Sequence, residues 1–318
     1  MIKYVFKTYI ADGVEHYVYG AVTCKDFDLK LQNIGFPDSL LSLAYMDIGT
    51  IEPLVKKLND ELWELITTHD KKHIEAAHAL LAELALRHVY FEHFQLDWQY
   101  RLSRAVIFED YTETMLPRQY LSGLSKNLRR MQAQVIDLFK NVLDIDRSKE
   151  PVSQRMVAYY NANGDNAFRF CPEPVGFELI NKSIFAEVLS PETVYDILDY
   201  HLRECVKRKV KMRVCKNCGK YFAVTGRATT EYCDRVFDEK GRTCKDVGAI
   251  VQWTRSKQDD DIFKAYRREY KKRFAWIKAG RISDEDFYTW SEKAREQKKK
   301  CDKGLITLEE FQRWLSES

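Results

Sequence analysis

The start of the chain alternates between apolar and polar positions, which is the period of a β-strand. Residues 4–10 are rich in aromatic and β-branched side chains, and residues 11–13 (Ala-Asp-Gly) supply a turn. Tyr17, Tyr19 and Ala21 then alternate with their neighbours. The beginning of the chain is therefore predicted to form a β-hairpin.

Helical spacing replaces this alternation from about residue 51 to residue 143, where apolar residues recur three and four positions apart. Pro117 is expected to end one helix, because proline lacks the N–H that a helix interior needs, and another helix is predicted over residues 119–143. Further on, Ser190 followed by Pro191 predicts a helix start, since serine caps a helix and proline suits its first turn. The middle of the chain is therefore predicted to be mainly helical.

The charged C-terminal end contains an internal repeat with a period of 24 residues, because residues 280–287 with Trp290 match residues 304–311 with Trp314. In each copy a Ser or Thr can cap a short helix, acidic residues follow in the first turn, and Phe and Trp three positions apart give one apolar face. Two copies are too few for a solenoid. The repeat therefore predicts a small helical appendage that docks on another surface, most simply the body of its own chain.

Composition excludes two classes of protein. With 45% hydrophobic and 13% aromatic residues among 318, the chain is not intrinsically disordered. Its N-terminus lacks the pattern of a secretory signal, and its longest apolar stretch, residues 79–86, is too short to span a bilayer. We therefore expect a cytoplasmic protein with no membrane partner, in which eight cysteines point to metal binding rather than to disulfides.

Four of the cysteines follow the spacing C-x2-C-x14-C-x10-C, namely Cys215, Cys218, Cys233 and Cys244. A tight turn in the C-x2-C-Gly segment aims two thiolates at one metal ion, and Gly219 tolerates the backbone conformation that follows. Four thiolates complete a tetrahedral Zn²⁺ and leave no open position, so one structural zinc ion is predicted. The scattered cysteines are interpreted as small apolar residues: Cys24, Cys171, Cys205 and Cys301.

These patterns together predict a mainly α protein with a small N-terminal β-hairpin or sheet, which is an α+β class. A zinc finger and a helical tail are expected at the C-terminal end. Polar, turn-rich segments at residues 144–154 and 161–166 are candidate boundaries. The expected parts are an N-terminal β-hairpin plus helical domain (1–150), a connecting α+β segment ending in a helix (151–205), a zinc finger (206–256) and a charged helical tail (257–318).

The cysteine segment also carries a resemblance. Cys215-Lys-Asn-Cys218-Gly-Lys-Tyr-Phe, followed by Tyr-Cys233 and by Cys244 before a helix, resembles the short zinc fingers of bacterial and phage-associated DNA-binding proteins, including the CGNR type. Cys244 is followed by Lys-Asp-Val-Gly rather than Gly-Asn-Arg, so the resemblance implies the metal site but not the DNA-reading role. About the last 130 residues also resemble an uncharacterised Firmicutes family of unknown function. That family implies no activity.

Charge is unevenly distributed along the chain. Residues 201–318 hold 30 basic and 19 acidic side chains, whereas the first 200 residues hold 21 and 29. A basic part of this kind favours an anionic partner such as nucleic acid, although packing of the acidic part against the basic part explains the asymmetry equally well. The candidate phosphate contacts are Lys207, Arg208, Lys209, Lys211, Arg213, Lys216, Lys220, Arg227, Arg235, Arg242, Lys245, Arg255 and Lys257.

Aromatic residues are interleaved with these cations. Tyr221, Phe222 and Trp253 could stack on bases, as aromatic side chains do in proteins that bind single strands. For Tyr221 and Phe222 we favour the alternative, in which both pack beside the metal as part of the core.

Patterns that indicate catalysis are sparse. His69 and His73 lie one helical turn apart with His78 nearby, but no H-E-x-x-H motif accompanies them, and a solvated helix face explains them better than a metal clamp. Arg87 and His93 match an Arg-x5-His spacing that resembles that of HEPN ribonucleases, in which such a pair would cleave RNA by acid–base chemistry. No catalytic residue is assigned.

Three functions are consistent with the sequence. We favour a zinc-containing nucleic-acid-binding protein, regulatory or linked to a mobile element. The alternatives are a protein-interaction scaffold that docks through its finger and its 24-residue repeat, and a HEPN-like ribonuclease. The sequence leaves open whether the nucleic acid is DNA or RNA, whether the chain is an enzyme, and what its oligomeric state is.

Overall fold

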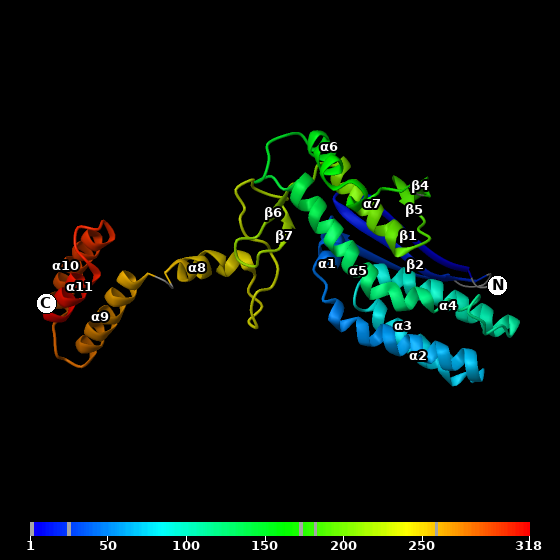
Figure 1. The fold of residues 1–318 in the computed structure, drawn as a ribbon, viewed down its shortest axis with the longest axis horizontal. Coiled ribbons are helices and arrows are strands. Elements are labelled where there is room, and N and C mark those ends of the chain that lie inside the picture. The colour runs from blue at the N-terminus through cyan, green and yellow to red at the C-terminus, as the bar shows by residue number, and fades with distance from the viewer. Residues whose placement is uncertain (1–2, 24–26, 172–173, 181–182, 258–259) are drawn as a thin grey trace. The chain divides into compact units, whose positions relative to one another are not determined.

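A computed structural model of the chain shows two compact units (Figure 1). Unit 1 consists of Met1–Val214 and Lys220–Thr230, and unit 2 consists of Cys215–Gly219 and Glu231–Ser318. Among the described residues, no helix combines the length and apolar character needed to cross a membrane. The described residues are 3–23, 27–171, 174–180, 183–257 and 260–318.

Unit 1 contains a five-stranded antiparallel sheet. The predicted hairpin is confirmed: β1 pairs with β2 along its whole length, with Ile10 opposite Glu15 beside the turn. β3 extends the hairpin, and the β4–β5 pair joins β1 where Thr8 meets Leu189, giving the order β3-β2-β1-β5-β4. The strands are β1 (Lys3–Ala11), β2 (Val14–Val22), β3 (Phe27–Gly35), β4 (Val175–Ile180) and β5 (Ile184–Leu189).

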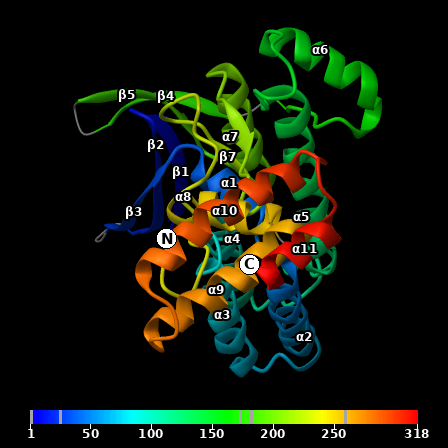
Figure 2. The ribbon, with the colours of Figure 1, turned by 90° about the vertical axis from the view of Figure 1, so that its left-hand side faces the viewer.

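One face of this sheet is covered by helices, as Figures 1 and 2 show. Alternate side chains of β2 point into the resulting core, where Glu15, Tyr17 and Tyr19 are buried, as a half-buried strand requires. The predicted helical middle region is confirmed. The helices of unit 1 are α1 (Asp38–Ala44), α2 (Glu52–Thr68), α3 (Lys72–Ala85), α4 (Tyr90–Phe108), α5 (Gln119–Leu138), α6 (Val152–Asn163) and α7 (Val194–Lys207), with 3-10 turns at Ile48–Thr50 and Gly164–Asn166 and a π-helical turn at Phe139–Leu143.

Two predicted helix ends were wrong. α4 ends at Phe108 and is followed by Glu109 in the left-handed region, so Pro117 lies in the turn before α5 instead of ending a helix. α7 is capped by Thr193 rather than Ser190. The reason is a capping box, in which Thr193 accepts a hydrogen bond from the backbone of Asp196 and the Asp196 carboxylate accepts one in return.

A short two-stranded sheet, β6 (Met212–Val214) with β7 (Tyr221–Ala223), also belongs to unit 1. Unit 2 is helical, and its tail helices α9, α10 and α11 lie side by side in both ribbon views (Figures 1 and 2). Phe287, Trp290 and Phe311 of the predicted repeat form their shared core. Ser283 and Thr307 cap α10 and α11 as expected. The helices are α8 (Cys244–Ser256), α9 (Asp261–Lys278), α10 (Asp284–Asp302) and α11 (Leu308–Glu317).

Candidate metal centre

The four cysteines that the spacing singled out come together in unit 2. Their Sγ atoms all lie within 4.8 Å of one another; Cys215, Cys233 and Cys244 are buried, and Cys218 is half-buried. The Sγ atoms of Cys218 and Cys233 are 3.7 Å apart. Four Zn–S bonds of about 2.3 Å in a tetrahedron would separate the sulfurs by about 3.8 Å. The donor set therefore fits one tetrahedral metal ion.

A tight turn supplies the first two donors. The backbone N–H of Gly219 donates to the carbonyl oxygen of Cys215 over 2.9 Å, which closes the turn around the pair. Gly219 has a φ of +73°, in the left-handed region. Most side chains would be strained at this φ, which explains why glycine follows Cys218.

The other two donors are held by backbone hydrogen bonds at the start of α8. The N–H of Cys244 donates to the carbonyl of Arg235 over 2.9 Å, and the N–H of Lys245 donates to the carbonyl of Cys233 over 3.0 Å. Thr243 caps the helix through a second capping box with Asp246, so that Cys244 is the first helical residue. A thiolate in this position gains from the positive end of the helix dipole.

Three N–H groups point at the sulfur atoms. The backbone N–H of Cys233 donates to Cys215 Sγ over 3.4 Å, and the side-chain amide of Asn217 donates to Cys244 Sγ over the same distance. The guanidinium of Arg235 lies 3.7 Å from Cys233 Sγ. Donors to sulfur stabilise thiolates and orient metal ligands. The surroundings of the cluster thus suit deprotonated, metal-bound cysteines.

The acidities of the thiols differ for physical reasons. Burial raises the pKa of Cys215, but the backbone N–H groups of Cys218, Cys233 and Asn217 outweigh it and bring that pKa down to about 7. Burial raises the pKa of Cys233 to about 12, and the charge of the neighbouring Cys215 adds to the rise. Crowding four thiolates is therefore costly unless a cation offsets their charge.

The predicted phosphate contacts are divided between the two units, so a continuous phosphate track stays a prediction. Unit 1 holds Lys207, Arg208, Lys209, Lys211, Arg213, Lys220 and Arg227. Unit 2 holds Lys216, Arg235, Arg242, Lys245, Arg255 and Lys257.

Several of the unit 1 cations form ion pairs or hydrogen bonds within the protein. Lys207 and Arg208 both pair with the buried carboxylate of Glu204, over 2.5 and 2.8 Å. Arg213 forms a two-fold ion pair with Asp146 and donates to the backbone carbonyls of residues 228 and 230. These three side chains are therefore already engaged within unit 1.

The remaining unit 1 cations are more accessible. Lys209, Lys211 and Arg227 are exposed, and their side chains have no ion-pair or hydrogen-bond partner within the described ranges. The ammonium of Lys220, also exposed, lies over the ring of Tyr45 at 5.3 Å.

Most unit 2 cations form ion pairs, and a pair on the surface is worth only about 0–1 kcal/mol and is easily exchanged for a phosphate. The pair of Lys257 with Asp260 is half-buried. The guanidinium of Arg255 instead donates to the carbonyl of Asn217 over 3.0 Å and so links α8 to the cysteine turn. The ion pairs are Lys216 with Glu231 (2.6 Å), Arg242 with Asp238 (2.6 Å), Lys245 with Asp234 (3.2 Å) and Lys257 with Asp260 (2.7 Å).

The three aromatic residues among these cations differ in burial. Tyr221 and Phe222 are buried, and the Tyr221 hydroxyl donates to the Asp144 carboxylate over 2.9 Å inside unit 1. Both are buried as expected, but they belong to unit 1, where Tyr221 packs in the main core, so the expected packing beside the metal is not shown. Trp253 on α8 is 49% exposed and remains accessible to a ligand.

The histidine and arginine patterns do not assemble into a catalytic site. His73 is half-buried and paired with Glu61 over 2.7 Å, so the expected solvated face is partly covered. Arg87 lines a cavity of about 540 Å³, whereas His93 lines a different one of about 610 Å³. His93 Nε2 donates to the carbonyl of Pro191 over 3.0 Å. The Arg-x5-His pair therefore does not share one cavity.

The other cysteines lie apart from the cluster. Cys205 and Cys301 are buried, as expected of small apolar residues, and Cys171 is exposed. Cys24 lies outside the described residues.

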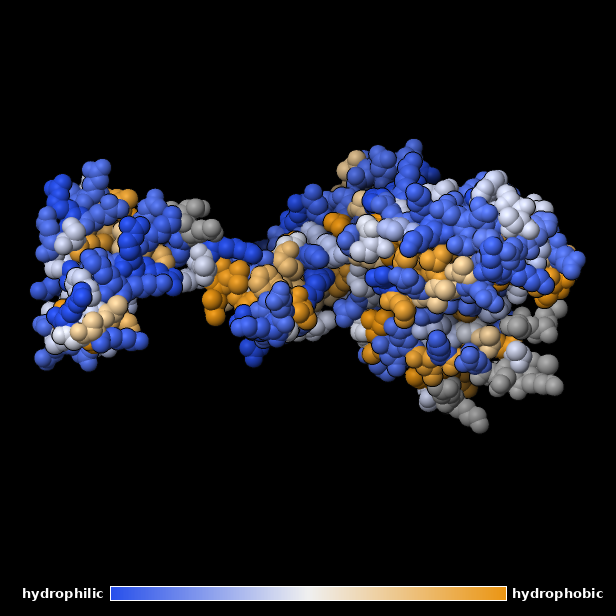
Figure 3. Space-filling view, turned by 90° about the horizontal axis from the view of Figure 1, so that it is seen from below, coloured by the Kyte–Doolittle hydropathy of each residue, from blue (hydrophilic) through white to orange (hydrophobic). Residues whose placement is uncertain are grey.

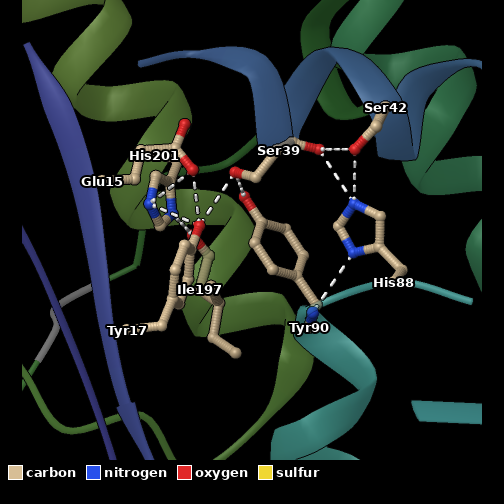
Figure 4. A network of polar contacts seen from close by, with 8 residues as sticks. All are labelled: Glu15, Tyr17, Ser39, Ser42, His88, Tyr90, Ile197 and His201. Carbon is tan, nitrogen blue, oxygen red and sulfur yellow. Dashed lines mark hydrogen bonds and ion pairs between the residues drawn. The ribbon is translucent and has the colours of Figure 1, made fainter. Parts of the chain in front are cut away.

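Sequence reasoning missed a buried polar cluster between β2, α1, α4 and α7 (Figure 4). The Tyr17 hydroxyl oxygen lies 2.7 Å from Glu15 Oε2, 2.9 Å from Ser39 Oγ and 3.1 Å from His201 Nε2. The Ser39 hydroxyl continues the network to the Tyr90 hydroxyl at 3.0 Å. These residues lie far apart in the sequence, so no local motif predicts the cluster.

Both histidines near this cluster are neutral at neutral pH. Burial lowers the pKa of His201 and of His88 to about 4, and it raises the pKa of Glu15 to about 8. His201 Nδ1 donates to the carbonyl of Ile197 over 2.8 Å, which leaves Nε2 as an acceptor. The 3.8 Å contact between His201 and Glu15 thus joins two uncharged groups.

Fold and site together define an α+β protein with a four-cysteine cluster that could hold one metal ion, followed by a helical tail. Residues 177–317, which include the cluster, match a family of unknown function (DUF6076). The searches of curated proteins and of solved structures found no match. Because the function of that family is unknown, the match indicates no activity.

Proposed function

We propose that the four cysteines bind one structural Zn²⁺ ion and that the chain is a zinc-containing nucleic-acid-binding protein. Cysteine thiolates in a tetrahedron select zinc over the hard cations. Four sulfur donors leave no position for water or substrate, so the ion's contribution is to the fold. The residues of this chain would then supply all contacts with nucleic acid.

The observation that carries the nucleic-acid part is the set of exposed cations next to the cysteine turn in the chain. Lys209, Lys211 and Arg227 have no acidic partner among the residues that the structure describes. Surface cations are usually interspersed with acids, and a set left unpaired favours an anionic ligand. Phosphate contacts of this kind supply affinity without requiring a base sequence.

Metal analysis of the reduced, full-length protein tests the first part. We expect one zinc per chain, and loss of that zinc in a Cys215→Ser, Cys218→Ser variant. Cys171→Ser is the matched control, because it removes an exposed thiol outside the cluster. Wild-type protein without stoichiometric metal would disprove the zinc site.

Fluorescence anisotropy with labelled nucleic acid at several salt concentrations tests the second part. We expect affinity to fall steeply with salt, and the slope to shrink by about 2 in a Lys209→Gln, Lys211→Gln, Arg227→Gln variant. Lys207 and Arg208 are left intact, since removing them would strand the buried carboxylate of Glu204. A matched control removes three exposed lysines of unit 1, Lys56, Lys57 and Lys71. No binding at low salt would refute the proposal.

A further inference from the structure

α9 carries a row of cations on one face. Lys264, Arg267, Arg268 and Lys271 follow the spacing i, i+3, i+4, i+7, which places them together on a helix, and all four are exposed. Lys264 pairs with Asp261 over 2.9 Å. Within the described ranges, neither Arg268 nor Lys271 has an ion-pair partner. Like charges so close destabilise a helix, which suggests that an anion offsets them.

The opposite face of α9 is already occupied. Ile262, Tyr266 and Tyr270 pack against the core that α9 shares with α10 and α11, and the three helices lie together in Figures 1 and 2. A basic helix that binds a membrane surface must insert its apolar face among the lipids. Because that face is covered here, the cations are better suited to a soluble polyanion.

The row of cations lines a groove of about 710 Å³ that also includes Trp253 of α8 and Phe263. The two rings meet edge to face with centroids 5.3 Å apart, and the guanidinium of Arg267 lies 5.8 Å from the Phe263 ring centroid. Among the described residues, no acidic side chain lines this groove. Figure 3 shows hydrophobic surface on the part of the molecule that α8 forms. Trp253 of α8 is 49% exposed.

We propose that this groove binds single-stranded nucleic acid, with the α9 cations along the phosphates and an unpaired base stacked on Trp253. The inference rests on the proposed nucleic-acid-binding function and assigns it a site and a class of ligand. Cations beside an accessible aromatic ring are the two elements of sequence-tolerant single-strand binding. A duplex hides the faces of its bases in the stack and would use only the cations.

An acidic protein segment is the competing occupant, and it would pair with the cations without needing the ring. The role of Trp253 therefore decides between the two. Trp253→Ala removes the stacking surface, whereas Trp253→Phe keeps an aromatic face and should restore most of the binding. Thermal unfolding and zinc content of each variant would show that unit 2 remains folded.

The test measures anisotropy of full-length protein with a labelled oligothymidylate of about 20 nucleotides and a duplex of the same length. We expect Trp253→Ala to weaken binding of the single strand about tenfold and to leave binding of the duplex unchanged. An Arg267→Gln, Arg268→Gln, Lys271→Gln variant should reduce the single-strand salt slope by about 2. The matched control removes three exposed lysines from α10 of the same unit, Lys293, Lys299 and Lys300.

Two failures are distinguishable. If wild-type protein binds neither oligonucleotide at low salt, the proposed function itself fails, and the groove proposal fails with it. If wild-type protein binds but the α9 variant behaves like the α10 control, the nucleic acid lies elsewhere and only the groove proposal is overturned. Equal loss of single-strand and duplex binding in Trp253→Ala would refute the stacking role.

Discussion

The side-chain amide of Asn217 donates a hydrogen bond to Cys244 Sγ across 3.4 Å, joining the cysteine turn to the first residue of α8. Asn217 is buried, 4% exposed, although it stands between two exposed or half-buried neighbours in a turn. Its side chain is therefore directed inward, toward the four-cysteine cluster. This one bond connects two residues that lie 27 positions apart in the chain.

We expect Asn217→Ala to lower zinc affinity about 10-fold or more, because hydrogen bonds to metal ligands typically contribute this much. Competition with a chromophoric chelator measures the change. The neighbouring Lys216→Gln variant, at an exposed position, should retain the wild-type affinity. Equal affinities for the Asn217 and Lys216 variants would mean that the bond does not support the site.

Chelation of the metal should loosen the start of α8 and spare the tail. The backbone N–H groups of Cys244 and Lys245 donate to the carbonyl oxygens of Arg235 and Cys233. Their protection from hydrogen exchange therefore depends on the metal holding residues 233–244 in place. The core of α9, α10 and α11 contains none of the four ligands. Hydrogen exchange with and without chelator should therefore show faster exchange at α8 and unchanged exchange at α10. Uniform exchange changes would contradict this.

Gly248→Ala should destabilise unit 2, although alanine is the better helix former by about 1 kcal/mol. A Cβ at this position would lie 2.2 Å from the Tyr232 ring, so the ring or the helix must move. Ala249→Gly, at an exposed position on the same helix, shows the ordinary propensity effect for comparison. Thermal unfolding, followed by a signal from the zinc site, measures the stability of both variants. A Gly248→Ala variant more stable than the wild type would show that the Tyr232 ring moves aside at little cost.

Stability should be greatest near pH 6.5, and Glu15 should cause its decline above that pH. With a folded-state pKa of about 8, raised by burial, Glu15 keeps a proton between pH 6.5 and 8 that the unfolded chain releases. Stability thus falls as pH rises, by up to about 1.4 kcal/mol per unit. Below pH 6.5 the unfolded chain binds one proton on each of His88 and His201, whose folded pKa values are about 4. These two protons outweigh the opposing effect of Glu15, so stability falls again as the pH falls.

Urea unfolding of a Glu15→Gln variant at pH 6.5 and pH 8 checks this expectation. The variant should lose the decline between the two values, because glutamine does not titrate. Glu83→Gln changes an exposed glutamate and should keep the wild-type profile. If the stability of the Glu15→Gln variant still declines between pH 6.5 and pH 8 as that of the wild type does, another group causes the decline.

The stability of the tail helices should depend on the two phenylalanine side chains of the repeat. Phe311 is fully buried among α9, α10 and α11, and its replacement by alanine should cost about 3–5 kcal/mol. Tyr288→Ala, at a side chain that is 64% exposed, should cost far less. Circular dichroism during unfolding compares them, and a small effect of Phe311→Ala would mean that the tail gains little from this core.

Patterns of short range were the ones that could be predicted. The hairpin and the capped tail helices follow from strict periods and capping residues, and Cys215 with Cys218 follows from a fixed spacing and a glycine. The row of cations on α9 was equally available from the sequence, since it has helical spacing. The groove that this row lines could not be predicted, because Trp253 and the α9 cations come together only in the folded chain.

Long-range arrangements could not be predicted from one sequence. The pairing of β5 with β1 joins residues about 180 positions apart, and the cluster around Tyr17 depends on four elements meeting. The engagement of Arg213 with Asp146 likewise appears only in the folded chain. Net charge therefore overstated how many of the basic residues are available to a ligand.

Tyr221 shows what the interleaving of the two units implies. The chain leaves unit 1 after Val214, contributes Cys215–Gly219 to unit 2, returns with Lys220–Thr230, and leaves again. A shortened polypeptide that stops before the cysteines would therefore lack Tyr221, whose hydroxyl satisfies the buried carboxylate of Asp144. Neither half can be excised by a single cut, so anyone dissecting this protein genetically should remove helices from the C-terminal end inward.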